Sequence, residues 1–221
     1  MIHISASLLS DFLWCNKRLY YRKLIPEEAV QTREQALGEA VHQFIATEKE
    51  NNNSLYESYF IKYSVDEEGI AKFKRCVNNY FYSYSSLTTN QDIVEKYFKI
   101  PYDKDVYLVG KMDRIIPQNH IIFDWKTEEK VKTSIDNNIQ FIIYYLAYKE
   151  LYGVEPELFY ANLAKNKTVK FIPKKEYINP VQNEIIPAAI DTIKRGNFYR
   201  AGLYNNGCPY CSFIKDCWKE L

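Results

Sequence analysis

The sequence predicts an α/β domain in which a central mixed sheet is flanked by helices. Helical periodicity covers most of the first 84 residues, strand-like runs follow from 94 to 127, and a helix, two strands and a last helix come after them. No internal repeat, low-complexity segment or long linker interrupts the 221 residues. Because 47% of the residues are hydrophobic, the chain can build a substantial core, and we expect a single domain over 1–221.

The helices are expected from apolar residues that recur at helical spacing. Their predicted ranges are Ser7–Leu24 with Cys15 inside it, Thr32–Glu50, Glu67–Tyr84, Ile135–Tyr152, and a last helix from Asn179–Pro180 to Arg195. Gly153 follows the fourth of these as a C-terminal cap, and Pro187 should interrupt the last. The tail from Gly196 has too little periodicity to predict a helix.

The strands are expected from β-branched and aromatic runs that lie between turn residues. They cover Val94–Ile100, Tyr107–Ile116, Ile121–Thr127, Glu157–Ala164 and Thr168–Pro173. The four residues 117–120, between the second and third strands, are typical of a hairpin loop. These two strands are therefore expected to be antiparallel neighbours.

The charge balance excludes a strong global attraction to nucleic acid. The net charge is +1, from 29 Lys and Arg against 28 Asp and Glu. Contact with DNA would need local basic patches, and the candidates are Lys17, Arg18, Arg22 and Lys23 in one segment and the lysines of 165–175 in another. Solvated faces explain both segments equally well. Without a signal peptide or an apolar run of membrane-spanning length, the protein is expected in the cytoplasm with no membrane contact.

Two acids and a lysine are placed to converge at the predicted hairpin. Side chains alternate along a strand, so Asp124 and Lys126 share one face and Trp125 lies on the other. The four-residue loop would set Asp113 directly opposite Asp124. Paired carboxylates suit Mg²⁺ or Mn²⁺, which can activate a water, and Lys126 could orient that water or stabilise charge on a phosphodiester. The alternative is a surface acid–lysine pair without a function.

Two pairs of residues spaced four apart on helices accompany these strands. Gly38 and His42 lie on one side of the second helix, where a neutral imidazole could ligate the same cation. Gln140 and Tyr144 could present an amide and a hydroxyl to a phosphate. Each pair alone is weakly informative, because a helical histidine beside an apolar face is commonly structural.

Together the four signals form an ordered set: Gly38-x-x-x-His42, Gly110-x-x-Asp113, Asp124-x-Lys126 and Gln140-x-x-x-Tyr144. This order resembles the RecB-like branch of the PD-(D/E)XK nucleases over about Ser5 to Trp218. The resemblance implies a PD-(D/E)XK nuclease core and a metal-dependent DNA exonuclease that acts on single-stranded ends. It implies catalysis by Lys126, Asp113 and Asp124, metal ligation by His42, Asp113, Asp124 and the main-chain carbonyl of Trp125, and substrate binding by Gln140 and Tyr144.

Four of the five cysteines are spaced as ligands of one metal centre. Cys208, Cys211 and Cys217 form a C-x-x-C-x5-C tail, and Cys15 lies almost two hundred residues earlier. Spacing alone admits structural zinc, a [4Fe–4S] cluster, or unligated core thiols. The fifth cysteine, Cys76, is expected to be a buried structural thiol.

The same resemblance favours the cluster. One cysteine before the histidine motif and three near the C-terminus are similar to the cluster-bearing members, which include the CRISPR-associated Cas-four family. The resemblance implies a [4Fe–4S] cluster that joins residues 1–31 to residues 196–221, with CRISPR integrase proteins as partners; recombination or repair is the other implied setting. Two alternatives stay open: a non-catalytic DNA-end-binding adaptor with a structural metal cluster, and an iron–sulfur electron carrier.

Overall fold

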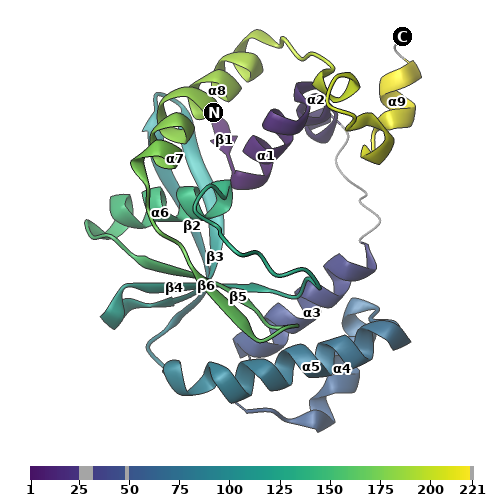
Figure 1. Cartoon of the computed structure of the whole chain (residues 1–221), viewed down its shortest axis with the longest axis vertical. Coiled ribbons are helices and arrows are strands. Elements are labelled where there is room, and N and C mark those ends of the chain that lie inside the picture. Colours follow the sequence, from purple (N-terminus) through teal and green to yellow (C-terminus); the bar gives the residue numbers. More distant parts are fainter. Residues whose placement is uncertain (25–31, 48–49, 220–221) are drawn as a thin grey trace.

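A mixed β-sheet forms the centre of the protein, which we describe from a computed structural model (Figure 1). The structure describes residues 1–24, 32–47 and 50–219. Over these ranges six strands pair in the order β1-β3-β4-β5-β6, and β2 pairs with β3 outside this path. Their bounds are β1 Ile2–Ile4, β2 Ile93–Asp103, β3 Val106–Ile116, β4 Ile121–Lys126, β5 Glu157–Asn162 and β6 Lys167–Lys170. The pairs β1–β3 and β4–β5 are parallel, and the other pairs are antiparallel.

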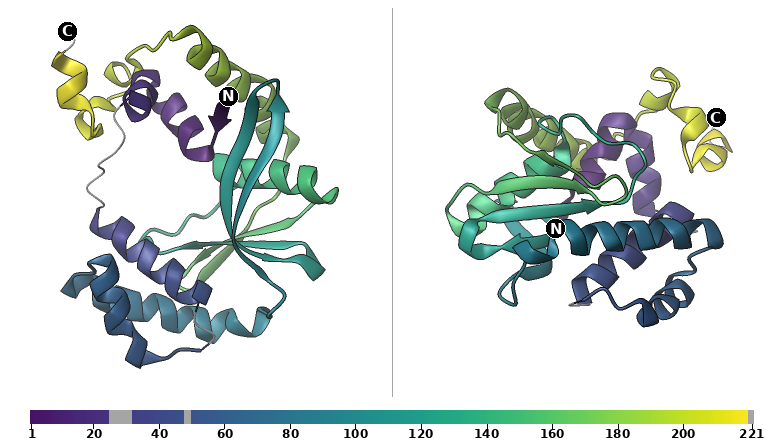
Figure 2. Two further views of the ribbon diagram at one scale, coloured as in Figure 1. Left: turned by 180° about the vertical axis from the view of Figure 1, so that it is seen from behind. Right: turned by 60° about the horizontal axis from the view of Figure 1, so that its bottom comes forward.

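Helices cover both faces of this sheet (Figures 1 and 2). Their bounds are α1 Ala6–Trp14, α2 Asn16–Leu24, α3 Arg33–Thr47, α4 Tyr56–Tyr63, α5 Glu67–Ser83, α6 Ile139–Tyr152, α7 Lys175–Pro180, α8 Ile186–Arg195 and α9 Ile214–Lys219. One apolar core lies between the sheet and α1, α6, α7 and α8. A second core lies between the sheet and α3, α4 and α5. Within the described ranges, no helix has both the length and the hydropathy that are needed to span a bilayer.

Strand β4 divides its side chains between the two cores. Ile122 packs in the α6 core, while Phe123 and Trp125 pack in the α3–α5 core. Because neighbouring residues of a strand point to opposite faces, Asp124 is directed toward the α6 side. Helix α6 connects β4 to its parallel neighbour β5, as a crossover between parallel strands requires. The carboxyl end of β4, which carries Asp124 and Lys126, is thereby held close to α6.

Most of the long elements form where the sequence predicts them. Helix α5 and strands β3 and β4 match the expected bounds to within one residue, and α3 covers most of the predicted second helix, of which 48–49 lie outside the described residues. Gly153 caps α6 with a left-handed φ of 72°. A π-helical turn over Val181–Ile185 separates α7 from α8 just before Pro187, as the interruption predicts. The α/β class with a mixed sheet flanked by helices is confirmed.

The prediction of one continuous first helix is wrong, because the chain divides it at Cys15. Cys15 is extended, with φ −165° and ψ 116°, and α2 begins at the next residue. The break lets Asp11 of α1 pair with Arg18 and Arg22 of α2, at 2.9 and 2.8 Å. Neither glycine nor proline marks this position, so the periodicity carries no sign of the break.

Other departures lie at element ends or in short elements. Helix α6 begins at Ile139 because the Asn138 side chain accepts a hydrogen bond from the Gln140 amide and caps it. The last helical region begins at Lys175, so Pro180 ends α7 instead of starting a helix. Strands β5 and β6 are shorter than predicted. The unexpected elements β1, α4 and α9 contain three, eight and six residues, too few for a clear periodic pattern.

Two glycines of the sequence motifs should respond oppositely to alanine. At Gly110 a β-carbon would lie 2.5 Å from a ring carbon of the buried Phe98, so Gly110→Ala should lower the free energy of unfolding by about 1–3 kcal/mol. At Gly38, inside α3, a β-carbon would only approach Thr127 Oγ1 at 3.5 Å. Gly38→Ala should therefore raise the free energy of unfolding by about 0.5–1 kcal/mol. Urea unfolding measures both values, and equal changes would contradict this packing.

Candidate active site

Strands β3 and β4 part at two facing acids. Their ladder ends at the pair Arg114–Phe123, so Asp113 and Asp124 occupy the next opposed positions, as the predicted four-residue loop requires. In place of a further backbone pair, the Trp125 amide donates a hydrogen bond to Asp113 Oδ2 at 2.8 Å. Both acids are buried, so their charges interact through little water.

Asp124 carries a buried charge whose one close polar partner among the described residues is Lys126. Its side chain is 1% exposed, and Lys126 Nζ lies 2.6 Å from Oδ2. Apart from this ion pair, neither carboxylate oxygen has a hydrogen-bond partner among the described residues. Burial, which Lys126 offsets only in part, acts with the nearby Asp113 to raise the pKa of Asp124 to about 6. Such a carboxylate is unfavourable unless a cation neutralises it.

Helix α3 brings His42 to the place where β3 and β4 part, which is called the opening below. Its Nε2 lies 2.9 Å from the Trp125 carbonyl oxygen, and its Nδ1 lies 3.6 Å from Asp113 Oδ1. Burial disfavours the charged imidazole, but the Asp113 carboxylate outweighs burial and raises the pKa of His42. The histidine likewise outweighs burial at Asp113 and lowers the pKa of that acid. Because both ring nitrogens face oxygen atoms, a metal ion could replace the imidazolium proton between these groups.

Arg114 holds α3 against the sheet. It is 7% exposed, and its Nη2 donates to the Ile45 carbonyl at 3.0 Å, near the C-terminal end of α3 where a cation is favoured. Asp92 lies 3.5 Å from its Nη1. Because Arg114 follows Asp113 in β3, the same strand positions both the helix that carries His42 and the acid that faces it.

Lys126 is a charged group at the edge of the opening. Its side chain is 24% exposed. Burial lowers the pKa of Lys126, but the carboxylates of Asp124 and Asp113 outweigh burial and raise it. The Lys126 ammonium is therefore charged at neutral pH and lies beside the carboxylates of Asp124 and Asp113.

Gln140 and Tyr144 of α6 form two linked hydrogen bonds that end on β3. Gln140 Nε2 donates to the Tyr144 hydroxyl at 2.8 Å, and this hydroxyl donates to the Lys111 carbonyl at 2.5 Å. Burial, together with the nearby Asp124 and Asp113 carboxylates, raises the pKa of Tyr144 well above its ordinary value. The hydroxyl thus positions β3, while Gln140 lines a polar groove between α1, α6 and β3.

An acid that the sequence analysis missed also reaches the opening. Glu95 lies in β2, and the ladder pairs on either side place it opposite Asp113. The ligand atoms of His42, Glu95 and Asp113 lie within 4.8 Å of one another, and no other group of this kind occurs in the described part of the chain. Glu95 lies in none of the four motifs. A count across the turn at 104–105 would not have identified it, because Asp103 pairs with Val106 and only the register shift between Pro101 and Asp103 brings Glu95 opposite Asp113.

The residues at this opening fit a divalent cation. Carboxylate oxygens, a main-chain carbonyl and an imidazole are donors that Mg²⁺ or Mn²⁺ accepts. The Asp124 carboxylate lies next to the group formed by His42, Glu95 and Asp113, and Lys126 and Lys111 are the nearby cations, paired with Asp124 and Glu95. A bound cation would relieve the repulsion between Asp113 and Asp124.

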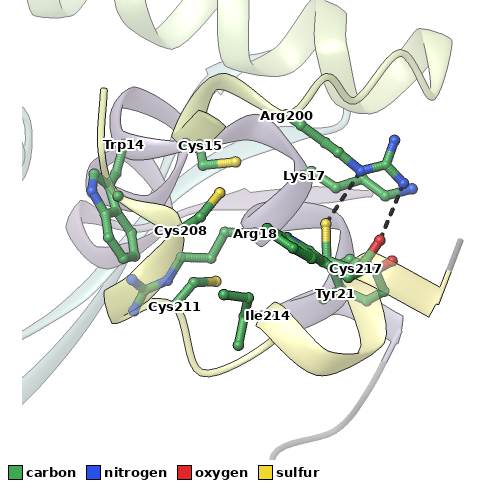
Figure 3. Close-up of a pocket in the computed structure, with 13 residues that line it drawn as sticks. Trp14, Cys15, Lys17, Arg18, Tyr21, Arg200, Cys208, Cys211, Ile214 and Cys217 are labelled. Atoms are coloured by element: carbon green, nitrogen blue, oxygen red, sulfur yellow. Dashed lines mark hydrogen bonds between the residues drawn. The ribbon is translucent and has the colours of Figure 1, made fainter. Parts of the chain in front are cut away.

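Four cysteines from distant parts of the chain line a second pocket (Figure 3). Cys15 lies between α1 and α2, Cys208 and Cys211 lie at a 3₁₀ turn, and Cys217 lies in α9. Burial raises the pKa of the Cys208 thiol, and the other three thiols raise it further because neighbouring thiolates repel. Among the described residues, no three cysteine sulfurs lie within 4.8 Å of one another, so the thiols surround the pocket without meeting.

Contacts between the N-terminal helices and the C-terminal segment border this pocket. The Lys17 amide donates to the Tyr199 carbonyl at 3.0 Å, which joins the start of α2 to the C-terminal segment. A β-carbon at Gly202 would lie 3.2 Å from Cys208 Sγ and 3.6 Å from Cys15 Sγ. Glycine at this position therefore preserves the space between the two sulfurs.

Cys76 takes no part in this pocket. It is fully buried in the core between α3, α5 and the sheet. Burial raises the pKa of its thiol to about 12, so it stays uncharged. Its predicted role as a buried structural thiol agrees with this location.

Many basic side chains of the two predicted patches form ion pairs with acidic residues of the same protein. The ion pairs are Arg18–Asp11, Arg22–Asp11, Lys165–Glu129, Lys170–Glu157 and Lys174–Asp136. The Lys17 ammonium lies 4.1 Å from the centre of the Tyr20 ring, and the side chain of Lys23 lies outside the described residues. These contacts favour the solvated-face interpretation for most members of both patches.

The architecture and the grouping of His42, Asp113, Asp124 and Lys126 are those expected of a PD-(D/E)XK nuclease core. The model of the PD-(D/E)XK nuclease superfamily matches residues 3–217. The chain therefore belongs to this superfamily, whose nucleases use divalent metals.

Solved structures share the fold over nearly the whole chain. A protein of Eubacterium rectale, named as a candidate exonuclease, matches with a TM-score of 0.66 and 12% identity, over 97% of this chain and 87% of its own. The protein SSO0001 matches with a TM-score of 0.52 and 19% identity, over 96% of this chain and 84% of its own. At these identities the likeness is one of fold. No curated protein matches the sequence.

Removal of the Asp124 charge should stabilise the metal-free protein. The folded protein holds the Asp124 proton more tightly than the unfolded chain does, so the charge costs stability above a pH of about 6, and this cost fades as the pH falls toward 3.8. In EDTA at about pH 8, Asp124→Asn should raise Tm by roughly 3–6 °C, and the gain should shrink toward about pH 5.

Asp136→Asn is the matched control for this melting experiment. Burial opposes its charge, but hydrogen bonds from Lys174 and the Ile172 amide outweigh burial and lower the pKa of Asp136. Its neutralisation should therefore lower Tm at the same pH. A lower Tm in both variants would show that Asp124 is not an unfavourable charge.

Proposed function

We propose that this protein is a Mg²⁺- or Mn²⁺-dependent deoxyribonuclease that hydrolyses phosphodiester bonds from the ends of single-stranded DNA. The observation that carries the proposal is the Asp124 carboxylate, which is buried with the Lys126 ammonium as its one close polar partner among the described residues and lies near Asp113 and His42. The chain belongs to a superfamily of nucleases, which supports hydrolysis of nucleic acid as its reaction. A non-catalytic adaptor would have no use for this unfavourable grouping of charges.

Each group at the opening has a chemical role in this proposal. Asp113, Asp124, His42 and the Trp125 carbonyl would hold the cation, which supplies Lewis acidity to the phosphate and to a water. The Lys126 ammonium, kept charged by its two acidic neighbours, would orient the attacking water and stabilise negative charge on the scissile phosphate. Removal of these charges from bulk water strengthens each of these interactions.

The polar groove beside the site is the proposed path of the DNA strand. Its lining includes Lys111, Gln140 and the serines at the start of α1. Gln140 would contact a phosphate or sugar, while Tyr144 would hold the Lys111 segment in place. The preference for ends follows the name of the Eubacterium rectale protein with this fold. By resemblance to the Cas-four family, we propose CRISPR adaptation with the integrase proteins as partners, with recombination or repair as the other setting.

Lys126→Ala should abolish cleavage without abolishing binding. With Mn²⁺ and an end-labelled linear single strand, the rate should fall by about 10²–10³-fold, because charge on the phosphate loses its fixed ammonium. Lys130→Ala, which removes an exposed lysine four residues further on, is the matched control and should keep the rate. Fluorescence polarisation in Ca²⁺ should give similar DNA affinities for all three proteins.

Two results of this assay would contradict the proposal. Undiminished degradation by the Lys126→Ala variant would remove the catalytic assignment of Lys126. Degradation of a covalently closed circular single strand at the linear rate would exclude the requirement for an end, while leaving nuclease activity intact.

We also propose that Cys15, Cys208, Cys211 and Cys217 hold a [4Fe–4S] cluster, so that residues 1–31 and 196–221 form a cluster-bearing portion of one nuclease domain. All four line one pocket, and glycine at position 202 leaves room between the sulfurs of Cys15 and Cys208. Zinc is the alternative. A tetrahedral zinc–thiolate site places its sulfurs about 3.8 Å apart, given bonds of about 2.3 Å. No three of the described sulfurs lie within 4.8 Å of one another, so the support for the cluster over zinc is the resemblance to the cluster-bearing nucleases.

The cluster predicts a visible absorbance band. Protein purified without oxygen should absorb near roughly 400 nm, from iron–thiolate charge transfer. Cys208→Ser should lose this band, whereas Cys76→Ala, the control for a cysteine outside the pocket, should keep it. Metal analysis that finds zinc, with no absorbance at this wavelength, would replace the cluster by a zinc site.

A further inference from the structure

A residue with left-handed backbone geometry interrupts β2 beside the candidate active site. The ladder between β2 and β3 pairs the neighbours of Glu95 but leaves Glu95 itself unpaired, opposite Asp113. Its φ is 52°, a conformation that residues other than glycine rarely adopt, least of all within a strand. The strand thus departs from regular geometry at the residue whose carboxylate reaches His42 and Asp113.

Lys111 holds this carboxylate in the structure. Its ammonium forms an ion pair with Glu95, and the hydrogen bond to Glu95 raises the pKa of Lys111. The Lys111 side chain is 56% exposed and the Glu95 side chain 28%, so the pair lies at the mouth of the opening. Lys111 precedes Asp113 by two residues in β3 and also lines the polar groove.

We propose that Lys111 and the divalent cation compete for the Glu95 carboxylate, so that Lys111 sets the cation affinity of the site. This inference rests on the cation-dependent function proposed above. Glu95 offers an oxygen within 4.8 Å of ligand atoms of His42 and Asp113, which is the reach of a shared ion. An ammonium on that oxygen cancels the charge that would attract a divalent cation and occupies one of its ligands.

Lys111 can release the Glu95 carboxylate to a cation by a movement of its side chain alone. Lys111 is a long, exposed side chain, so its ammonium can leave Glu95 without disturbing the core. The Tyr144 hydroxyl binds the main-chain carbonyl of Lys111, so the strand stays in place while the side chain moves. The released ammonium would then lie at the groove that we assign to the DNA strand.

Cation binding would respond differently to substitutions if the Glu95–Lys111 pair were purely structural. If the pair only stabilised the hairpin, loss of either partner would alter cation binding in the same direction or leave it unchanged. Competition requires opposite signs, because one variant removes a ligand and the other removes a rival for that ligand.

Calorimetric titration of Mn²⁺ into the protein without DNA separates these cases. Glu95→Gln should weaken Mn²⁺ binding by about tenfold, and Lys111→Met should strengthen it by about threefold. Lys96→Met is the matched control: it removes the same charge from an exposed neighbour of Glu95 in β2 and should change the affinity by less than about twofold.

The outcomes distinguish the exchange from the function on which it rests. A shift in the same direction for Glu95→Gln and Lys111→Met, or an unchanged affinity in Glu95→Gln while Asp113→Asn abolishes binding, overturns the competition alone. Undiminished Mn²⁺ binding in Asp113→Asn removes the cation site itself. Circular dichroism in EDTA checks folding. Should Glu95→Gln not fold, Lys111→Met decides the matter: tighter binding supports competition, and unchanged or weaker binding overturns it.

Discussion

The hydrogen bond from the Trp125 amide to Asp113 is the interaction on which the site depends. It replaces a backbone pair between β3 and β4, so the two strands part where their acids face each other. The indole on the other side packs against Tyr80, Tyr84 and Phe123. The Trp125 carbonyl then faces His42. One residue therefore positions an acid, a histidine and a carbonyl oxygen from its main chain, while its ring anchors the strand in the core.

The two cores permit the unfavourable charges between them. The buried Asp124 carboxylate loses hydration and is repelled by Asp113, which destabilises the fold locally. The apolar packing on both faces of the sheet extends far beyond these residues, so the domain can tolerate a strained strand end. The same packing prevents the acids from moving apart. The packing therefore holds both acids in place for the proposed cation.

The sequence predicted the parts of the site that local pattern determines. Strand alternation and the four-residue loop place Asp113 opposite Asp124, and the helical spacing of His42 follows from the apolar stripe of α3. Glu95 was missed because its position depends on the register of a second hairpin and on a backbone conformation that no side-chain pattern encodes. The break at Cys15 was missed because tertiary ion pairs, and not a helix-breaking residue, stabilise it. Short elements such as β1 depend on pairing with distant strands.

The seam between the first helices and the C-terminal segment has a consequence for the order of events during synthesis. The side-chain amide of Asn205 donates to the Trp14 carbonyl at 2.7 Å, and the pocket of Cys15 is completed only by residues after 200. Nascent α1 and α2 therefore gain these contacts only after residues beyond 200 have been translated. The six strands of the sheet all precede residue 171, so the sheet can form before this seam closes.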